Sequence, residues 1–417
     1  MADNKDKKVL NVPALRFPEF TEEWKRIKVS DLLDFYSTNS LSWEQLEYES
    51  NEPYNLHYGL IHVGLPTIID LTKDKLPSIK DGNVPKKYEL CKEGDIAFAD
   101  ASEDTNEVAK VVEFYNLDGK KVVCGLHTIH GRNNNGQTAK GFLGYCFSST
   151  VFHNQIRRIA QGTKIYSINT RNFSEVFVGL PSMNEQQKIA TLLRLMDERI
   201  ATQNKIIEKY ESLIQAIIYK AKMNGISKGT WKRIDLYKVL QERNEKNVEG
   251  RTICSVSVSQ GVVNQIEYLG RSFAAKQTSH YNVVKYGDIV YTKSPTGDFP
   301  YGIIKRSNIR EDVAVSPLYG VYIPVNDSIG VILHFYFMRP GNAFNYLHPL
   351  IQKGAKNTIN ITNRRFLENS VPLPISENEA NTIAGILKSI QEKIEIEKSL
   401  LQSYTKEKEY LLRQMFI

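Results

Sequence analysis

Few residues in this chain have the types and spacing that catalysis needs. His127 and His130 have the i, i+3 spacing that would pair two imidazoles on a helix, but their neighbours indicate a strand, where such residues point to opposite faces. Glu23 and Lys25 have the Glu-x-Lys spacing found in many nucleases, without a preceding Pro-Asp strand. The segment 51–54 (Asn-Glu-Pro-Tyr) differs at Glu52 from the Asn/Asp-Pro-Pro-Tyr tetrapeptide with which amino-methyltransferases hold a flipped base, and we interpret it as a turn.

Cofactor and metal signatures point the same way. Cys91, Cys124, Cys146 and Cys254 are scattered, without the paired Cys-x-x-Cys spacing of a zinc site, so we interpret all four as reduced packing residues and predict no metal site. Neither phosphate-binding glycine motif occurs, which argues against ATP or dinucleotide binding. We therefore expect any catalysis to belong to a partner.

Length and composition indicate several folded domains. The 417 residues, 41% of them hydrophobic, suffice for two to four domains of ordinary size. No run approaches the ~20 apolar residues of a membrane span, so a soluble, cytoplasmic protein is expected. The net charge is +7, and residues 226–372 alone carry +8, whereas 1–179 carry −2. This charge favours an anionic partner.

The sequence repeats itself at a spacing of about 190 to 210 residues. Trp24-Lys-Arg-Ile27 returns as Trp231-Lys-Arg-Ile234, and Gly94-Asp-Ile96 returns as Gly287-Asp-Ile289. Gly-rich turns at Gly162 and Gly354 are each followed by Arg and Phe, which pairs Arg171 with Arg365. Leu180-Pro181 matches Leu373-Pro374. The repeat indicates a duplication with internal two-fold pseudosymmetry.

A long helix is expected after each Leu-Pro. Ser182-x-x-Glu185 and Ser376-x-x-Glu379 both have the sequence of a capping box. Apolar residues then recur alternately every four and three residues, which predicts a coiled-coil seam. The first seam contains Ile189, Leu193, Met196, Ile200, Ile207, Tyr210 and Ile214, and the second contains Ile383, Leu387, Ile390, Ile394, Leu401, Tyr404 and Leu411.

Two seams of matching length predict that the helices pack on each other. A single amphipathic helix would usually pack on its own domain, but the two seams, 189–221 and 383–415, are 33 residues long and need a partner along their whole length. Polar Gln203 near Glu397 could fix their register, and Gly225 is expected to end the first helix. The predicted fold is α+β, with two α/β domains (1–179 and 226–372) and two antiparallel spacer helices (180–225 and 373–417).

This arrangement resembles the specificity subunit of a type I restriction-modification system. The resemblance covers nearly the whole chain, through Trp24-Lys25 and Trp231-Lys232, the Gly-Asp-Ile strands, the Gly-rich turns, and Leu180-Pro with Glu185-Gln-Gln-Lys-Ile189. The second copy departs from the helix signature, because Ala380 replaces the Gln that follows the Glu.

The resemblance implies a non-catalytic DNA-binding role. Each domain would read one half of a split, asymmetric sequence in double-stranded DNA, and the paired helices would set the distance between the halves. Two modification subunits carrying S-adenosylmethionine, and restriction subunits using ATP and Mg²⁺ for motor and nuclease activity, would bind alongside. This chain itself would hold no cofactor and would lie in a bacterial or archaeal cytoplasm.

Basic and amide side chains near the Gly-rich turns are the candidates for DNA contacts, because Arg and Lys favour guanine edges and Asn and Gln favour adenine. They are Arg132, Asn133, Lys164, Tyr166, Asn169 and Arg171 in the first domain, and Lys293, Ser294, Thr296, Lys356, Asn357, Asn360, Arg364 and Arg365 in the second. Any one of them could contact phosphate instead of a base.

Two other functions stay open. A DNA methyltransferase or nuclease acting alone would turn over methyl donor or cut DNA without partners. A coiled-coil scaffold that binds only proteins would lack the salt-sensitive DNA binding expected of a specificity subunit.

Overall fold

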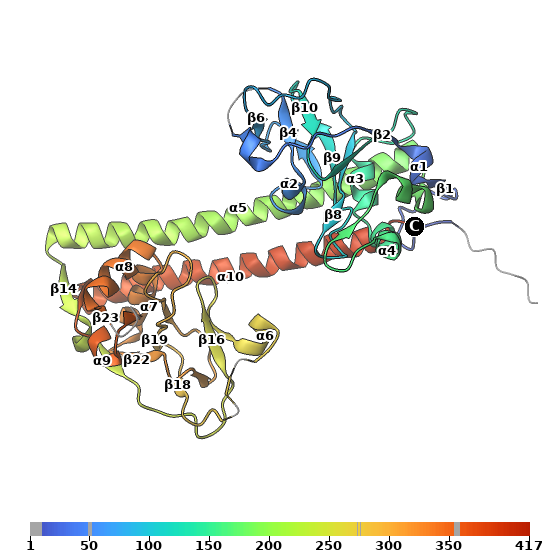
Figure 1. Cartoon of the computed structure of the whole chain (residues 1–417). Helices are drawn as coiled ribbons and strands as arrows, with labels where there is room; N and C mark the ends of the chain where they lie inside the picture. Colours follow the sequence, from blue (N-terminus) through green and yellow to red (C-terminus); the bar gives the residue numbers. More distant parts are fainter. Residues whose placement is uncertain (1–10, 49–51, 273, 276, 354–358) are drawn as a thin grey trace, which may run out of the picture. The chain divides into compact units, whose positions relative to one another are not determined.

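The computed structural model describes residues 11–48, 52–272, 274–275, 277–353 and 359–417, in two compact units (Figure 1). One unit runs to Asn204 and includes Leu400–Ile417, and the other is Lys205–Ser399. Both long helices, α5 (Met183–Lys228) and α10 (Glu377–Gln414), contribute one part to each unit. None of the described helices combines the length and apolar content that crossing a membrane requires.

A five-stranded sheet forms the centre of the first unit. Its order is β2 (Asp34–Tyr36), β11 (Thr128–Arg132), β7 (Ile96–Ala99), β9 (Val111–Asn116) and β5 (Ile68–Asp70). A four-stranded sheet has the order β10 (Val122–Cys124), β4 (Tyr54–Leu56), β6 (Ser78–Ile79) and β3 (Leu46–Glu47). Two-stranded pairs join β1 (Lys25–Lys28) to β13 (Phe177–Leu180) and β12 (Tyr166–Ser167) to β8 (Ala101–Ser102).

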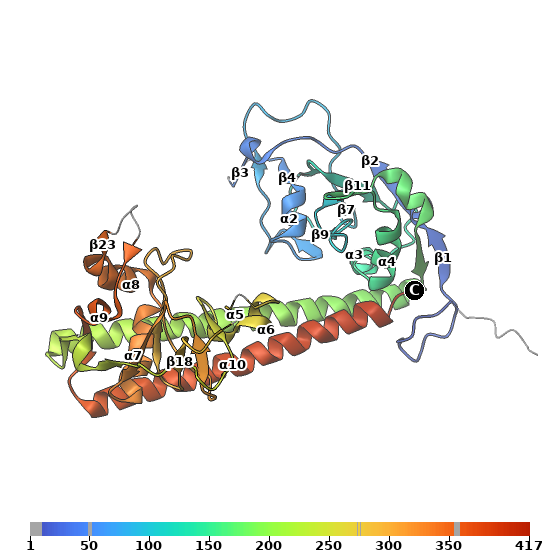
Figure 2. The ribbon, with the colours of Figure 1, turned by 60° about the horizontal axis from the view of Figure 1, so that its bottom comes forward.

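Strand β7 is buried on both faces, because successive side chains point to opposite sides. Ile96 and Phe98 pack in one apolar core with residues of α3 (Phe142–Phe147) and α4 (Thr150–Ile159). Ala97 and Ala99 pack in a second core with residues of α2 (Tyr58–His62), β4 and β10. Figure 2 shows α3 and α4 next to each other beside this sheet. The remaining short helices are α1 (Val29–Leu32), η1 (Trp43–Gln45) and η2 (Thr170–Glu175).

The second unit has its own four-stranded sheet, in the order β15 (Leu240–Glu242), β22 (Gly320–Pro324), β19 (Ile289–Tyr291) and β20 (Ile304–Arg306). Its two-stranded pairs are β14 (Trp231–Asp235) with β25 (Ser370–Pro374), β16 (Cys254–Ser257) with β17 (Gly261–Asn264), β18 (Asn282–Val284) with β21 (Val313–Val315), and β23 (Gln352–Lys353) with β24 (Ile359–Asn360). The helices are η3 (Leu236–Lys238), α6 (Gln265–Leu269), α7 (Asp327–Phe337), α8 (Pro340–Leu347), η4 (His348–Leu350) and α9 (Asn363–Phe366).

The sequence repeat is visible in strand pairing. The Trp-Lys-Arg-Ile strand pairs antiparallel with the strand that ends in Leu-Pro, and the register is the same in both copies. Lys25 lies opposite Leu180 in the first unit, and Lys232 lies opposite Leu373 in the second. The predicted fold class, α+β with two similar domains and two long antiparallel helices, is therefore confirmed.

Within each unit the two long helices run antiparallel. In the first, Lys408 pairs with Asp197 at 2.5 Å, and Arg199 donates to the Tyr404 hydroxyl at 3.0 Å. In the second, Lys398 lies 3.3 Å from Glu211. Every seam residue named above is buried or half-buried, and so is Gln203. Whether Gln203 faces Glu397 stays a prediction.

The glutamates of the two expected capping boxes have other partners. Both Glu185 oxygens accept from the Arg16 guanidinium at 2.7 Å. Glu379 accepts from the Trp231 indole nitrogen at 2.8 Å. Both helices begin where predicted, but the reciprocal hydrogen bond expected of these glutamates is replaced by long-range contacts that tie each helix start to its unit.

Gly225 does not end the first helix, which continues to Lys228 before Gly229 adopts φ +72°. A Cβ at Gly225 would lie 1.9 Å from Cδ1 of buried Trp231. Glycine is therefore present because the indole packs against the helix backbone, and the expectation that Gly225 stops the helix is wrong.

Two helical glycines should respond oppositely to alanine. Gly385→Ala is expected to stabilise the second unit by about 0.5–1 kcal/mol, because Gly385 lies in α10 with nothing within 4 Å of its Cβ position. Gly225→Ala is expected to destabilise it by about 1–3 kcal/mol, through overlap with Trp231. Denaturant unfolding of both variants checks this, and a stabilising Gly225→Ala would contradict the packing described.

Candidate nucleic-acid interface

An exposed loop and the short helix η2 that follows it carry four of the first domain's six candidates. Backbone hydrogen bonds between Gln161 and Ser167 close the loop, at 2.8 and 3.0 Å. Gly162 makes the turn possible with φ +136°, since a Cβ there would lie 1.8 Å from the Ile165 carbonyl oxygen. Lys164 is exposed, and Tyr166 is half-buried in β12, which pairs with β8. The chain then enters η2, where Asn169 accepts from the backbone of exposed Arg171.

The second domain presents two comparable segments. The loop between β19 and β20 carries half-buried Lys293 and exposed Ser294 and Thr296, and reciprocal backbone hydrogen bonds between Thr296 and Phe299 close it. Helix α9 carries exposed Arg364. Asn363 in α9 donates to Glu242 at 2.7 Å, and the same carboxylate opposes the lowering of the Lys293 pKa by burial. Glu242 therefore brings the two segments together.

The structure changes which arginine of the second domain is the counterpart of Arg171. Asn169 caps η2 and Thr362 caps α9, and each cap lies four residues before a fully buried phenylalanine, Phe173 or Phe366. Each phenylalanine contacts a ring from the Gly-Asp-Ile strand, with centroids 4.9 Å apart for Phe98–Phe173 and 4.7 Å for Tyr291–Phe366. The counterpart of Arg171 is therefore Arg364, two residues after the cap in both copies.

The sequence repeat pairs Arg365 with Arg171, but the Arg365 side chain makes contacts within its own domain. Its Nε donates to the Leu350 carbonyl at 2.7 Å, and its guanidinium lies 3.4 Å from Glu368. Asn133 is half-buried, and its side chain bonds Thr138 and the Asn135 backbone within its own loop. Lys356 and Asn357 lie outside the described residues, and of Asn360 only its place in β24 is described.

Arg132 does not suit a DNA contact, which corrects the sequence-based prediction. Its side chain is buried and makes two 2.8 Å hydrogen bonds to Asp95, with a third at 2.7 Å to Glu89. Burial favours the neutral carboxyl of Asp95, but hydrogen bonds from His130 and Arg132 hold its pKa below the usual value. Arg132 is also the last residue of β11, at the opposite end of the strand from His127, whose carbonyl accepts from the Asp100 backbone nitrogen.

The second domain contains an aspartate–arginine pair like Asp95 and Arg132. Asp288 occupies the position of Asp95 in the repeated Gly-Asp-Ile, and Arg243 binds it through two hydrogen bonds of 2.6 and 3.0 Å. Each aspartate also accepts from the backbone nitrogen three residues earlier, Lys92 or Lys285, at 2.8 Å. The Gly-Asp-Ile motif is thus a buried aspartate–arginine anchor.

Removing Arg132 is expected to damage stability. Arg132→Leu would remove the charged partner of Asp95, which is 1% exposed, and leave only His130 and the Lys92 backbone nitrogen as donors, at a cost of about 3–5 kcal/mol. Arg171→Ala, at an exposed site, should change stability by less than about 0.5 kcal/mol. Equal unfolding midpoints for the two variants would show that Arg132 is not an anchor.

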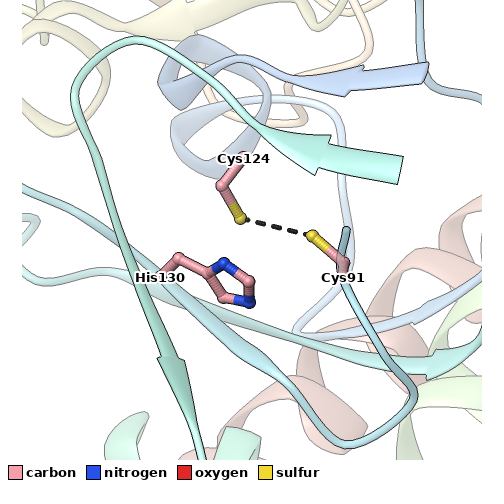
Figure 3. A group of neighbouring side chains, drawn as sticks. All are labelled: Cys91, Cys124 and His130. Atoms are coloured by element: carbon pink, nitrogen blue, oxygen red, sulfur yellow. Dashed lines mark hydrogen bonds between the residues drawn. The ribbon is translucent and has the colours of Figure 1, made fainter. Parts of the chain in front are cut away.

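Sequence reasoning missed two features of the first domain. Directly before β11, half-exposed His127 lies 3.1 Å from Asp100, and the Asp100 carbonyl accepts from the backbone of Ile168, which follows the loop closed by Gln161 and Ser167. In the middle of β11, His130 lies beside Cys91 and Cys124, which are far apart in the sequence (Figure 3). Neither grouping has a local sequence signal, because each joins residues that are distant in the chain.

One solved structure agrees with this architecture, and a family model matches part of the chain. Residues 74–212 match a family model described as the type I restriction modification DNA specificity domain. The fold resembles that of the S subunit of a type I restriction-modification system from M. genitalium. The match covers 97% of this chain and 99% of that protein, with 15% identity and a TM-score of 0.57. The HsdS subunit from Thermoanaerobacter tengcongensis matches 93% of this chain and 95% of its own at 16% identity, with a TM-score of 0.36.

Proposed function

We propose that this chain reads a DNA target made of two separate half-sites. Residues 74–212 match the type I restriction-modification DNA specificity domain, and the chain has the fold of a specificity subunit. The observation that carries the proposal is the duplicated placement of Arg171 and Arg364. Each follows a helix cap and precedes a buried phenylalanine anchored on the Gly-Asp-Ile strand.

These two positions suit base recognition. Both arginines are exposed, and none of the described residues is shown binding either guanidinium. An unpaired guanidinium can make a bidentate contact with the O6 and N7 atoms of guanine. The short helices that carry them are held by fully buried rings, so the side chains are presented from a fixed backbone. In this proposal, residues 1–179 and 226–372 are the two recognition domains.

The long helices would fix the distance between half-sites. A helix resists bending, and α5 and α10 contain 46 and 38 residues, or about 69 and 57 Å at ~1.5 Å per residue. Ion pairs in both units hold them antiparallel. A spacer of fixed length sets the number of unread base pairs, as dimer geometry sets half-site spacing in other DNA-binding proteins.

In this proposal the chain is non-catalytic and directs other subunits to DNA. Two modification subunits would carry S-adenosylmethionine, and restriction subunits would use ATP and Mg²⁺. The repeat would offer each modification subunit a helix start that follows a Leu-Pro strand end, at Ser182 and Ser376.

Exchange of one recognition domain tests the function. Residues 231–374 would be replaced by the corresponding segment of a relative with a different target, and the assembled complex used to map DNA modification. One half-site should change while the other half-site and the spacing stay the same. Change of both half-sites, or of neither, would contradict independent reading by the two domains.

A further inference from the structure

We propose that Cys91, Cys124 and His130 form a zinc-binding site inside the first domain. One ligand atom from each residue lies within 4.8 Å of the others (Figure 3). The side chains come from three segments of the chain: the one before β7, strand β10 and strand β11. All three are nearly inaccessible to solvent, at 6%, 2% and 0% exposure.

One nitrogen of the His130 imidazole has no hydrogen-bond partner among the described residues. Nε2 is bonded to Asp95 at 2.7 Å, and the nitrogen without a partner in the described part of the chain is the buried Nδ1. A buried polar atom without a partner costs about 1–3 kcal/mol and calls for an explanation. A metal ion bound at Nδ1 would supply one. The carboxylate on the far nitrogen is then the outer partner that metal-binding histidines usually have, fixing ring orientation and tautomer.

The sulfur geometry fits a tetrahedral ion. Two thiolates at ~2.3 Å from a zinc ion are about 3.8 Å apart at the tetrahedral angle, and the Cys91 and Cys124 sulfurs are 3.6 Å apart. A disulfide would place them at ~2.05 Å, so both cysteines are reduced. Thiolate and imidazole ligands together favour zinc over the oxygen-seeking cations.

Charge balance also supports zinc. Two thiolates and a neutral imidazole neutralise Zn²⁺, so the buried site carries no net charge, while Asp95 and Arg132 neutralise each other beside it. Three protein ligands leave the fourth tetrahedral position for a water molecule. Zinc sites with three protein ligands are usually catalytic, but the burial of all three side chains here argues against access by a substrate.

The role we infer is structural. Cys124 lies in the four-stranded sheet and His130 in the five-stranded sheet, so the ion would link the two sheets of the first domain. Residues 226–372 contain only one cysteine, Cys254, so this link belongs to the first domain alone.

Metal analysis of the purified full-length chain tests the site. We expect about one zinc per chain after expression with zinc, and exchange with cobalt should give the near-ultraviolet thiolate-to-cobalt charge-transfer band. Cys124→Ser should lose at least about nine-tenths of the bound metal. Cys146→Ser and Cys254→Ser are matched controls, since both remove a buried cysteine outside the cluster and should keep the metal.

Metal uptake by the wild-type chain tests the proposed zinc site even if Cys124→Ser fails to fold. A chain that takes up less than about one-tenth equivalent of zinc or cobalt under reducing conditions would overturn the proposal. So would bound cobalt without a thiolate band, or equal metal loss in the Cys254→Ser control.

Discussion

Removing seven residues from each long helix, 200–206 from α5 and 399–405 from α10, is expected to shorten the unread part of the DNA target by about three base pairs. Seven residues are one heptad, so each apolar seam keeps its register. They span ~10.5 Å at ~1.5 Å per residue, and base pairs rise ~3.4 Å each. The deleted stretches match because the Asp197–Lys408 and Glu211–Lys398 pairs flank both. Affinity for the original spacing should fall more than about 100-fold.

Selection of binding sites by the assembled complex measures this shift. Both half-sites should be recovered unchanged with a shorter gap. A deletion from α5 alone is the control, and it should abolish selective binding because the seams no longer match in length. Recovery of the original gap by the double deletion would show that the helices do not set the spacing.

Arg171→Ala is expected to weaken binding at one half-site by about 1–3 kcal/mol, or roughly 5- to 150-fold, and to relax its sequence preference there. Arg364→Ala should do the same at the other half-site. The physical reason is loss of a bidentate contact to a base edge, with the backbone that presents it intact. Competition binding with single-base variants of each half-site measures both effects.

Random duplex provides the contrast for the arginine variants. A phosphate contact would weaken specific and random DNA equally and reduce the salt dependence by about one charge, which would contradict base reading. Lys209→Ala, at an exposed position of α5, is a matched loss of positive charge and should leave the sequence preference of both half-sites unchanged.

The duplication and the long helices are predictable because their signals are local. The Trp-Lys-Arg-Ile and Leu-Pro motifs recur, and the structure pairs them in identical register, Lys25 with Leu180 and Lys232 with Leu373. Heptad spacing depends only on helix periodicity, so the seams could be identified without knowing what covers them.

Residues whose roles depend on distant partners could not be assigned from sequence. Arg132 looks like a DNA contact in isolation, but burial and Asp95 make it an anchor. Gly225 has the composition of a helix stop, yet Trp231 determines its role. The cluster of Cys91, Cys124 and His130 forms only when two sheets pack together. In each case tertiary contacts override the local pattern.

The arrangement of bases selected from random double-stranded DNA by the complete complex tests the central claim most directly. Two unrelated short blocks should be enriched, separated by a gap of constant length and arbitrary sequence. Enrichment of one uninterrupted block, or of two blocks at variable distances, would contradict reading by two domains on a fixed spacer.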